Sequence, residues 1–415
     1  MKIRFALALS SCLIALSSHP LWAEPNDQDT SALRLSLDKV SLYAETGKMD
    51  QAFALLDKLK AQYPNNPLVL QEEADLNLRQ GNRGAGFAAL NQALTLDPGN
   101  EDIIDRQRSA MLEQGSFAAA GYLFRQSKQA NEQLTDLAGQ AALSPSITAE
   151  LKVDDDHLHT RLPFTAVNGT AENFSSDRQR ATATIGKIYT SGDESSASLY
   201  AGNDSVGGGA SYRLWDHYGA TLLQANVNRP DWDYVETVVE NGTKDNIRIE
   251  RKQIFSSNWQ ATLGGGYNHY NLQHDWNVAS AAAWDLNVGY NTPYAFSSDN
   301  KITLGLDYDV SAEYFTHMDR RFANGIDYKP LDANSYEIHS LNATAHKDFS
   351  SQWYAEAFGG YSIDRLGGNG PSFGGVLEYM PLTHLGAELR ASREIMGARN
   401  GGEVSQVGLN LKWRW

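Results

Sequence analysis

The chain is poor in cysteine and in basic residues. Its 415 residues include a single cysteine, Cys12, which lies in the amino-terminal segment. One cysteine cannot form an internal disulfide, and if a leader carries Cys12 away, no thiolate chemistry is left to the mature chain. Lys and Arg number 35 against 50 Asp and Glu, for a net charge of -15. This balance argues against nucleic acid as a partner.

Long hydrophobic runs are also missing. Past residue 23 no stretch approaches the roughly 18 apolar residues of a membrane helix, and the mean hydropathy of -0.45 is that of an ordinary soluble protein. A search for long apolar runs does not detect transmembrane β-barrels, because their strands place apolar residues only at alternate positions. Any membrane crossing by this chain must therefore be made by strands.

The carboxy-terminus shows such an alternation. One face carries Val407, Leu409, Leu411, Trp413 and Trp415, and the other carries Gln406, Gly408, Asn410, Lys412 and Arg414. A period of two with an aromatic last residue is typical of the closing strand of an outer-membrane barrel, whose lipid side is apolar and whose lumen side need not be. We expect the protein in the outer membrane of a Gram-negative bacterium.

The amino-terminus predicts secretion. Residues 1–23 have a short basic start, an apolar run over 5–16 and a small residue closing Leu21-Trp22-Ala23, as a cleaved signal peptide does. The mature chain then begins near Glu24. A rival interpretation takes Leu9-Ser10-Ser11-Cys12 as a lipoprotein cleavage box, but it leaves an apolar region of only about seven residues before the cut.

The next section repeats with a period of 34 residues. This interval separates Gly47, Gly81 and Gly115, and also Pro64 and Pro98. It is the period of tetratricopeptide repeats, in which glycine closes the first helix and proline follows the second.

Residues beside these positions match as well. Phe53 and Ala54 align with Phe87 and Ala88, and the small residues would let paired helices approach closely. We predict two full repeats and a degenerate third over residues 31–133, with a concave groove for protein partners. The alternative is an unrelated array of helical hairpins that serves only as a spacer.

From residue 147 onwards the pattern has a period of two. After a linker over 134–145, we predict an antiparallel barrel over 146–415 with about fourteen strands, or sixteen if residues 234–240 form an extra hairpin with the strand from Ile247. Short links alternate with long ones at 155–177, 228–246 and 315–334, which places both barrel ends in the periplasm. The link 292–300 is longer than this rule expects. The fold class is α + β, in two domains.

The faces of the strands predict an acidic lumen. The inward acids are Glu150, Asp154, Asp285, Asp307, Asp309, Glu313, Glu378 and Glu388, and the basic minority is Lys152, Arg390, Lys412 and Arg414. A wall of one charge sign in a narrow channel concentrates the opposite charge, so the expected passenger is cationic or neutral. The alternative is that the acids belong to ordinary solvated surfaces and outer loops.

Repeats followed by a barrel resemble the outer-membrane exporters of biofilm exopolysaccharides, of the Pel, poly-N-acetylglucosamine and cellulose type. His217-Tyr218-Gly219-Ala220 and the segment from Asn228 to Glu236 look most like the Pel exporter barrel. The resemblance implies that the lumen passes the polymer, that the acids contact it, and that Gly47, Phe53, Gly81 and Phe87 belong to a scaffold for periplasmic enzymes. Family members carry many more repeats, so a separate scaffold protein is a further expected partner.

Two clusters suggest other chemistry. Asp154-Asp155-Asp156-His157-Leu158-His159 has metal-ligand residues, but a strand sends neighbours to opposite faces, so we expect no metal there. Asp231 and Asp233 flank Trp232 in a predicted loop and could contact a sugar.

No Gly-x-Ser-x-Gly elbow occurs, and we predict no catalytic residue and no cofactor. The predicted function is export of a cationic or neutral amino-sugar polymer, with lipid, the barrel assembly machinery and a glycan-modifying enzyme as partners. The alternatives are a receptor or adhesin using its outer loops, or an outer-membrane enzyme.

Overall fold

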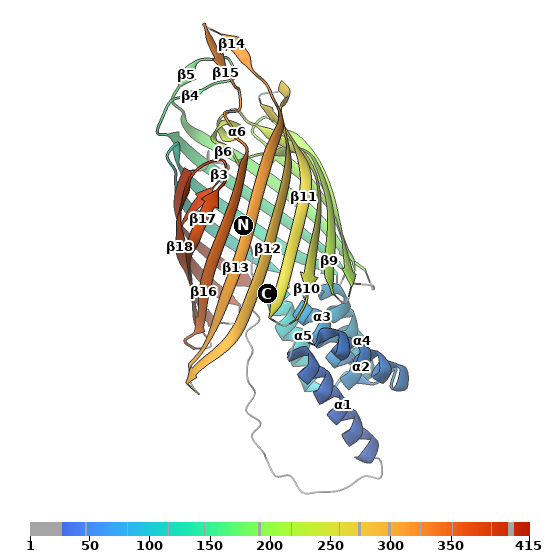
Figure 1. Cartoon of the computed structure of the whole chain (residues 1–415). Helices are drawn as coiled ribbons and strands as arrows, with labels where there is room; N and C mark the ends of the chain where they lie inside the picture. Colours follow the sequence, from blue (N-terminus) through green and yellow to red (C-terminus); the bar gives the residue numbers. More distant parts are fainter. Residues whose placement is uncertain are drawn as a thin grey trace. The chain divides into compact units, whose positions relative to one another are not determined.

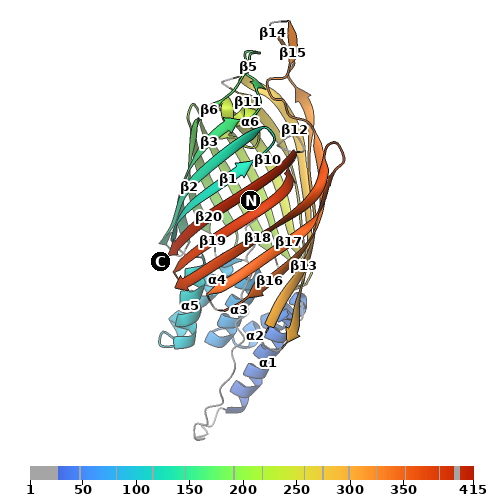
Figure 2. The same ribbon diagram turned by 90° about the vertical axis from the view of Figure 1, so that its left-hand side faces the viewer.

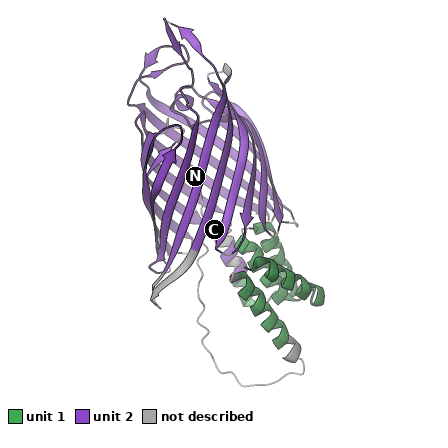
Figure 3. Cartoon of the chain, viewed as in Figure 1, with its two compact units in different colours: residues 1–105 green, residues 106–415 purple. Residues whose placement is uncertain are grey.

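The structure is a computed structural model. It describes residues 27–45, 48–80, 82–114, 116–144, 146–189, 192–216, 218–256, 258–272, 275–297, 300–323, 325–350, 352–382, 384–396 and 402–415. The chain divides into two compact units, residues 1–105 and 106–415 (Figure 3). The predicted signal peptide and the repeat glycines Gly47, Gly81 and Gly115 lie outside the described residues.

The first unit is helical. Its helices are α1 (Asp27–Glu45), α2 (Met49–Gln62), α3 (Pro67–Gln80) and α4 (Arg83–Leu96), and α5 (Glu101–Gln114) crosses into the second unit. The starts of α2 and α4 are 34 residues apart, as are those of α3 and α5. Pro64 and Pro98 follow the ends of α2 and α4, as predicted. The helical repeat is thus present, while its tetratricopeptide character stays a prediction.

Close helix packing occurs beside the predicted positions. Ala54 is exposed and Ala88 is half-buried, whereas Ala52 is fully buried. Its repeat partner Gly86 is also buried, and a Cβ there would lie 2.6 Å from Cγ of Leu78. The buried small residues are thus Ala52 and Gly86, so the prediction of Ala54 and Ala88 was wrong by two positions. Two steps of about 100° along a helix turn a side chain to the opposite side.

Phe53 and Phe87 differ in burial. Phe53 lies in the core cluster with Leu56 and Leu59, and Phe87 is half-buried. Both are therefore packing residues of the helical unit to different degrees. No helix among the described residues is long and apolar enough to cross a membrane.

The second unit is a closed antiparallel barrel (Figures 1 and 2). Its sixteen described strands are β1 (Phe117–Gln126), β2 (Ala130–Ser144), β3 (Ile147–Thr160), β6 (Ser175–Ile188), β7 (Glu194–Gly202), β8 (Val206–Asp216), β9 (Gly219–Pro230), β10 (Thr243–Ile254), β11 (Trp259–Leu272), β12 (Asp275–Ser297), β13 (Asn300–Met318), β16 (Tyr336–Asp348), β17 (Trp353–Asp364), β18 (Asn369–Leu382), β19 (Leu385–Met396) and β20 (Gly402–Arg414). Neighbours in sequence pair throughout, and β1 closes the barrel on β20.

The predicted domain boundary was wrong. Residues 117–144, expected as a third repeat and a linker, form β1 and β2, with Phe117 opposite Arg414. Only α5 remains of the third repeat. Residues 234–240 are not an extra hairpin but include the short helix α6 (Val235–Val239). The upper estimate of sixteen strands was right, but the two additional strands lie at the start of the barrel.

The outer face of the barrel is apolar. Leu151, Leu199, Leu263 and Leu411 stand on it and are 48–69% exposed. Because such a surface is buried only in lipid, and a closed barrel leaves no backbone edge unpaired, this unit is built to span a membrane.

Long and short connections lie at opposite ends. β2, β8, β12 and β18 finish, and the strands that follow them start only three residues later, at the end where β1 starts and β20 finishes, which we call the turn end. The long loops 161–174, 231–242 and 319–335 are at the other end, the loop end. Two of them contain small hairpins, of β4 (Phe164–Thr165) with β5 (Ala171–Glu172) and of β14 (Arg321–Ala323) with β15 (Ile326–Tyr328). The predicted long link 292–300 is mostly strand, because β12 continues to Ser297.

Candidate functional site: the lumen and an internal loop

The predicted lumen acids stand at inward strand positions. Glu150 and Asp154 alternate with the exposed Leu151 and Val153 on β3, and Asp307 alternates with Leu306 on β13. The same rule places the remaining predicted acids inward. Whether any of them contacts a polymer stays a prediction.

Several of these acids are paired with bases inside the barrel. Asp154 lies 2.8 Å from Nζ of Lys152 and 2.9 Å from Nε of Arg180. Asp285 lies 2.6 Å from Arg248, and Glu388 pairs with Arg390. The lumen is therefore a mixed polar lining and not a uniform row of uncompensated carboxylates.

Loop 231–242 folds into the barrel at the loop end, where α6 is seen inside the ring of strands (Figure 1). All five residues of α6 are buried. Val235, Val238 and Val239 pack against Ala130 of β2 and Leu158 of β3. The inward Leu158 thus gives an apolar contact to the loop, which explains a leucine within an otherwise polar stretch of β3.

Arg178 on β6 holds the end of α6. Its guanidinium donates hydrogen bonds to the carbonyl oxygens of Val238 (3.0 Å) and Val239 (2.6 Å). These carbonyls have no partner within a helix that ends here, and a cation is favoured at a helix carboxy-terminus. The contact therefore fixes the loop to the wall next to β3.

Glu313 on β13 holds the other side of the loop. Tyr234 donates its hydroxyl hydrogen to one carboxylate oxygen (2.7 Å), and Tyr270 and Asn268 donate to the other (2.6 and 2.7 Å). The residue is buried. Predicted as a lumen wall residue, Glu313 is instead occupied by the loop. Since β3 and β13 are well separated in the strand order, the loop crosses the lumen.

The base of the loop is charged. Nζ of Lys244 lies 3.1 Å from Asp231 and also pairs with Asp233, whose side chain is half exposed. Burial raises the pKa of Asp231, whereas the positive charge of Lys244 lowers the pKa of Asp233. Trp232 stacks under the guanidinium of Arg180 at 4.2 Å. Within the predicted sugar-contact trio, Asp231 thus faces Lys244 and not solvent.

The other long loops join this one. Glu240 accepts a hydrogen bond from the backbone of Val167 (3.0 Å), and the Tyr328 hydroxyl donates to the Val167 carbonyl (2.8 Å). Leu331 and Ala333 pack in one buried cluster with Tyr234. The three long loops therefore form one connected layer at the loop end.

The aspartate and histidine stretch of β3 splits between two faces. Asp154 and Asp156 are buried on the inward side, while His157 faces outward and lies 2.7 Å from Asp177. Across the described ranges, no group of three or more His, Cys, Asp or Glu is arranged to hold a metal ion.

No family model and no curated protein matches the chain. Among solved structures, a bacterial polysaccharide outer membrane secretin is similar over 72% of this chain and 98% of its own, with 9% identity and a TM-score of 0.52. OmpF of Salmonella typhi, in complex with daunomycin, covers 72% and 96% with 11% identity and a TM-score of 0.37. The toluene transporter TbuX of Ralstonia pickettii covers 74% and 94% with 10% identity and a TM-score of 0.36. The first of these similarities shows the fold alone, that of an outer-membrane barrel.

Proposed function

We propose that the chain is an outer-membrane channel that exports a biofilm exopolysaccharide of cationic or neutral, amino-sugar type, with its helical repeats docking a periplasmic glycan-modifying enzyme or scaffold protein. The observation that carries the proposal is one chain that joins helices repeating every 34 residues to a closed barrel with a polar lumen. The fold similarity to a polysaccharide secretin agrees with it.

The charge of the lumen supports a cationic or neutral passenger. The inward faces of β13, β17, β18 and β19 carry six acids, namely Asp307, Asp309, Glu313, Glu356, Glu378 and Glu388, and the base Arg390, which pairs with Glu388. The inward bases Arg180 and Arg213 stand on β6 and β8, across the strand order, whereas Arg248 on β10 pairs with Asp285 on the nearby β12. Ammonium groups of a polymer would be attracted to the first wall and repelled by the second.

Export through this barrel requires loop 231–242 to move. Polar anchors hold the loop, namely Arg178, Glu313 and Lys244, and a hydrated polymer can compete for such contacts. A closed resting lumen would also keep solutes from leaking when no polymer is present.

The test of export is made in cells. Deleting the gene should leave the polymer in the periplasm, and the wild-type chain should restore secretion. A variant with Asp307→Asn and Asp309→Asn should restore it less well, since the acidic wall is weakened while Glu313 and the loop are unchanged. Normal secretion without the protein would refute the proposal.

A receptor or adhesin is the second candidate, favoured by the connected layer of three long loops at the loop end. The ends of loop 231–242 are already paired, because the Asp231 N–H donates to the Gly242 carbonyl at 2.9 Å. Residues 232–241 can thus be replaced by an Asn-Gly turn. For a channel, this change should raise ion conductance; for a receptor, it should abolish ligand binding with no change in conductance.

A further inference from the structure

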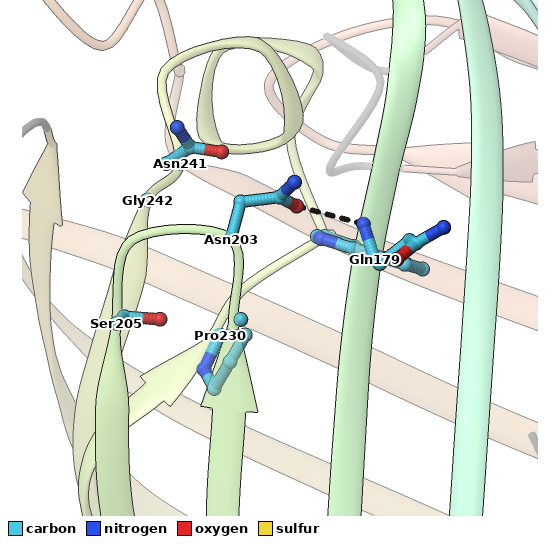
Figure 4. A pocket seen from close by; sticks show the side chains of 8 residues that line it. Gln179, Asn203, Ser205, Pro230, Asn241 and Gly242 are labelled. Atoms are coloured by element: carbon cyan, nitrogen blue, oxygen red, sulfur yellow. Dashed lines mark hydrogen bonds between the residues drawn. The ribbon is translucent and has the colours of Figure 1, made fainter.

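A small depression lies at the rim of the barrel, where β6, the β7–β8 turn and both ends of loop 231–242 meet (Figure 4). Its empty space is about 200 Å³, including space open to solvent. Gln179, Asn203, Ser205, Asn241 and Trp232 contribute side chains to its lining. No charged side chain lines it, in contrast to the lumen beside it.

The side-chain amides of Asn203 and Asn241 are each fixed by one hydrogen bond. Oδ1 of Asn203 accepts a hydrogen bond from the backbone N–H of Gln179 at 2.7 Å, which Figure 4 shows. Nδ2 of Asn241 donates to Asp204 at 2.5 Å. Within the described ranges, Nδ2 of Asn203 and Oδ1 of Asn241 have no protein partner. A fixed donor and a fixed acceptor thus remain for a ligand.

Further groups extend this set. The side chains of Gln179 and Ser205 make no hydrogen bond to any residue that the structure describes, and both border the depression. The guanidinium of Arg180 stacks on the ring of Trp232, and this cation–π contact holds the ring in its orientation. The lining therefore combines neutral donors and acceptors with an aromatic side chain, which suits a neutral polar ligand with several hydrogen-bonding groups.

We propose that this depression is a subsite for one edge of a neutral sugar residue, and that it takes the acetamido group of an N-acetylated amino sugar in the exported polymer. The assignment rests on the proposed function for the polymer class. An acetamido group offers a carbonyl acceptor and an N–H donor, which match Nδ2 of Asn203 and Oδ1 of Asn241. The carboxylate beside the lining, that of Asp204, already accepts the hydrogen bond of Asn241, so a charged ammonium group gains little there.

The test uses the full chain purified in detergent and saturation-transfer NMR. The probes are the neutral trimer of N-acetylglucosamine and the cationic trimer of glucosamine. The neutral trimer should show contact and the cationic one much less. Gln179→Ala combined with Ser205→Ala removes the two side chains that are left for hydroxyl groups of the sugar ring, and should weaken binding of the neutral trimer roughly tenfold, as expected for two lost hydrogen bonds.

Gln352→Ala is the matched control, since Gln352 lies in a turn at the turn end and its side chain donates only a long 3.4 Å bond to the Pro381 carbonyl. It should bind like the wild type. Equal binding of both trimers, or unchanged binding in the double variant, would overturn the subsite. Secretion that depends on the protein together with absent trimer binding would refute the subsite alone, and trimer binding without any role in secretion would refute export alone.

Discussion

Removing one hydroxyl should loosen the loop that crosses the lumen. Tyr234→Phe deletes the hydrogen bond to Glu313, while the edge contact of the ring with Tyr270 (5.6 Å, 85°) is retained. The carboxylate keeps Tyr270 and Asn268 as donors, so no unpaired charge results. A hydrogen bond to a charged group contributes about 1.5–3 kcal/mol. The population of the displaced loop should therefore rise about 10- to 150-fold.

The measurement is the frequency of opening events in planar bilayers. Tyr270→Phe is the control, because it removes an equivalent bond to Glu313 from the wall and not from the loop. Its openings should rise far less than those of Tyr234→Phe. If both variants open at the wild-type frequency, and replacing 232–241 by a turn changes nothing either, the loop does not close the channel.

Further predictions concern assembly and selectivity. Trp415→Ser should deplete the heat-modifiable barrel from outer-membrane fractions, since the terminal aromatic residue serves as an assembly signal; undiminished levels would contradict this. Deleting 31–114 should leave a folded barrel that no longer co-purifies with a periplasmic partner, whereas deleting 31–133 removes β1 and should abolish the barrel in gel-shift assays. The wild-type channel should prefer cations, most clearly at low salt, where screening extends beyond about 10 Å. Asp307→Asn with Asp309→Asn should weaken that preference in reversal-potential measurements. Anion selectivity of the wild type would contradict the inference that the inward acids attract a cationic passenger.

The sequence was sufficient for the faces of the strands. Lipid tolerates only apolar side chains and the strand period is two, so Leu151 and Leu411 fix the outward face and their neighbours the inward face. The predicted alternation of short and long connections is also found in the structure. The two additional strands at the start, β1 and β2, are an even number and therefore do not exchange the ends at which short and long connections lie. These features follow from constraints that act along a single strand or between adjacent ones.

The start of the barrel could not be read from local pattern. Phe117 to Gly121 has small residues that fit a helix as well as a strand, and the 34-residue spacing favoured a third repeat. The deciding partner is β20, almost 300 residues away, since Ala118 and Ala120 lie opposite Trp413 and Leu411. Closure of the barrel, and not propensity, makes this segment a strand.

The internal loop illustrates the same limit for the candidate site. Val235 to Val239 contains three valines, a composition that favours a strand, yet it forms a helix. The αL backbone of Asn241 ends the segment, and the valines gain burial against Ala130 and Leu158 that an exposed hairpin would lack. The same long-range contacts reassign Glu313. Alternation correctly turned its side chain inward, but only the folded loop shows that its carboxylate binds Tyr234 and so anchors the segment that a polymer must displace.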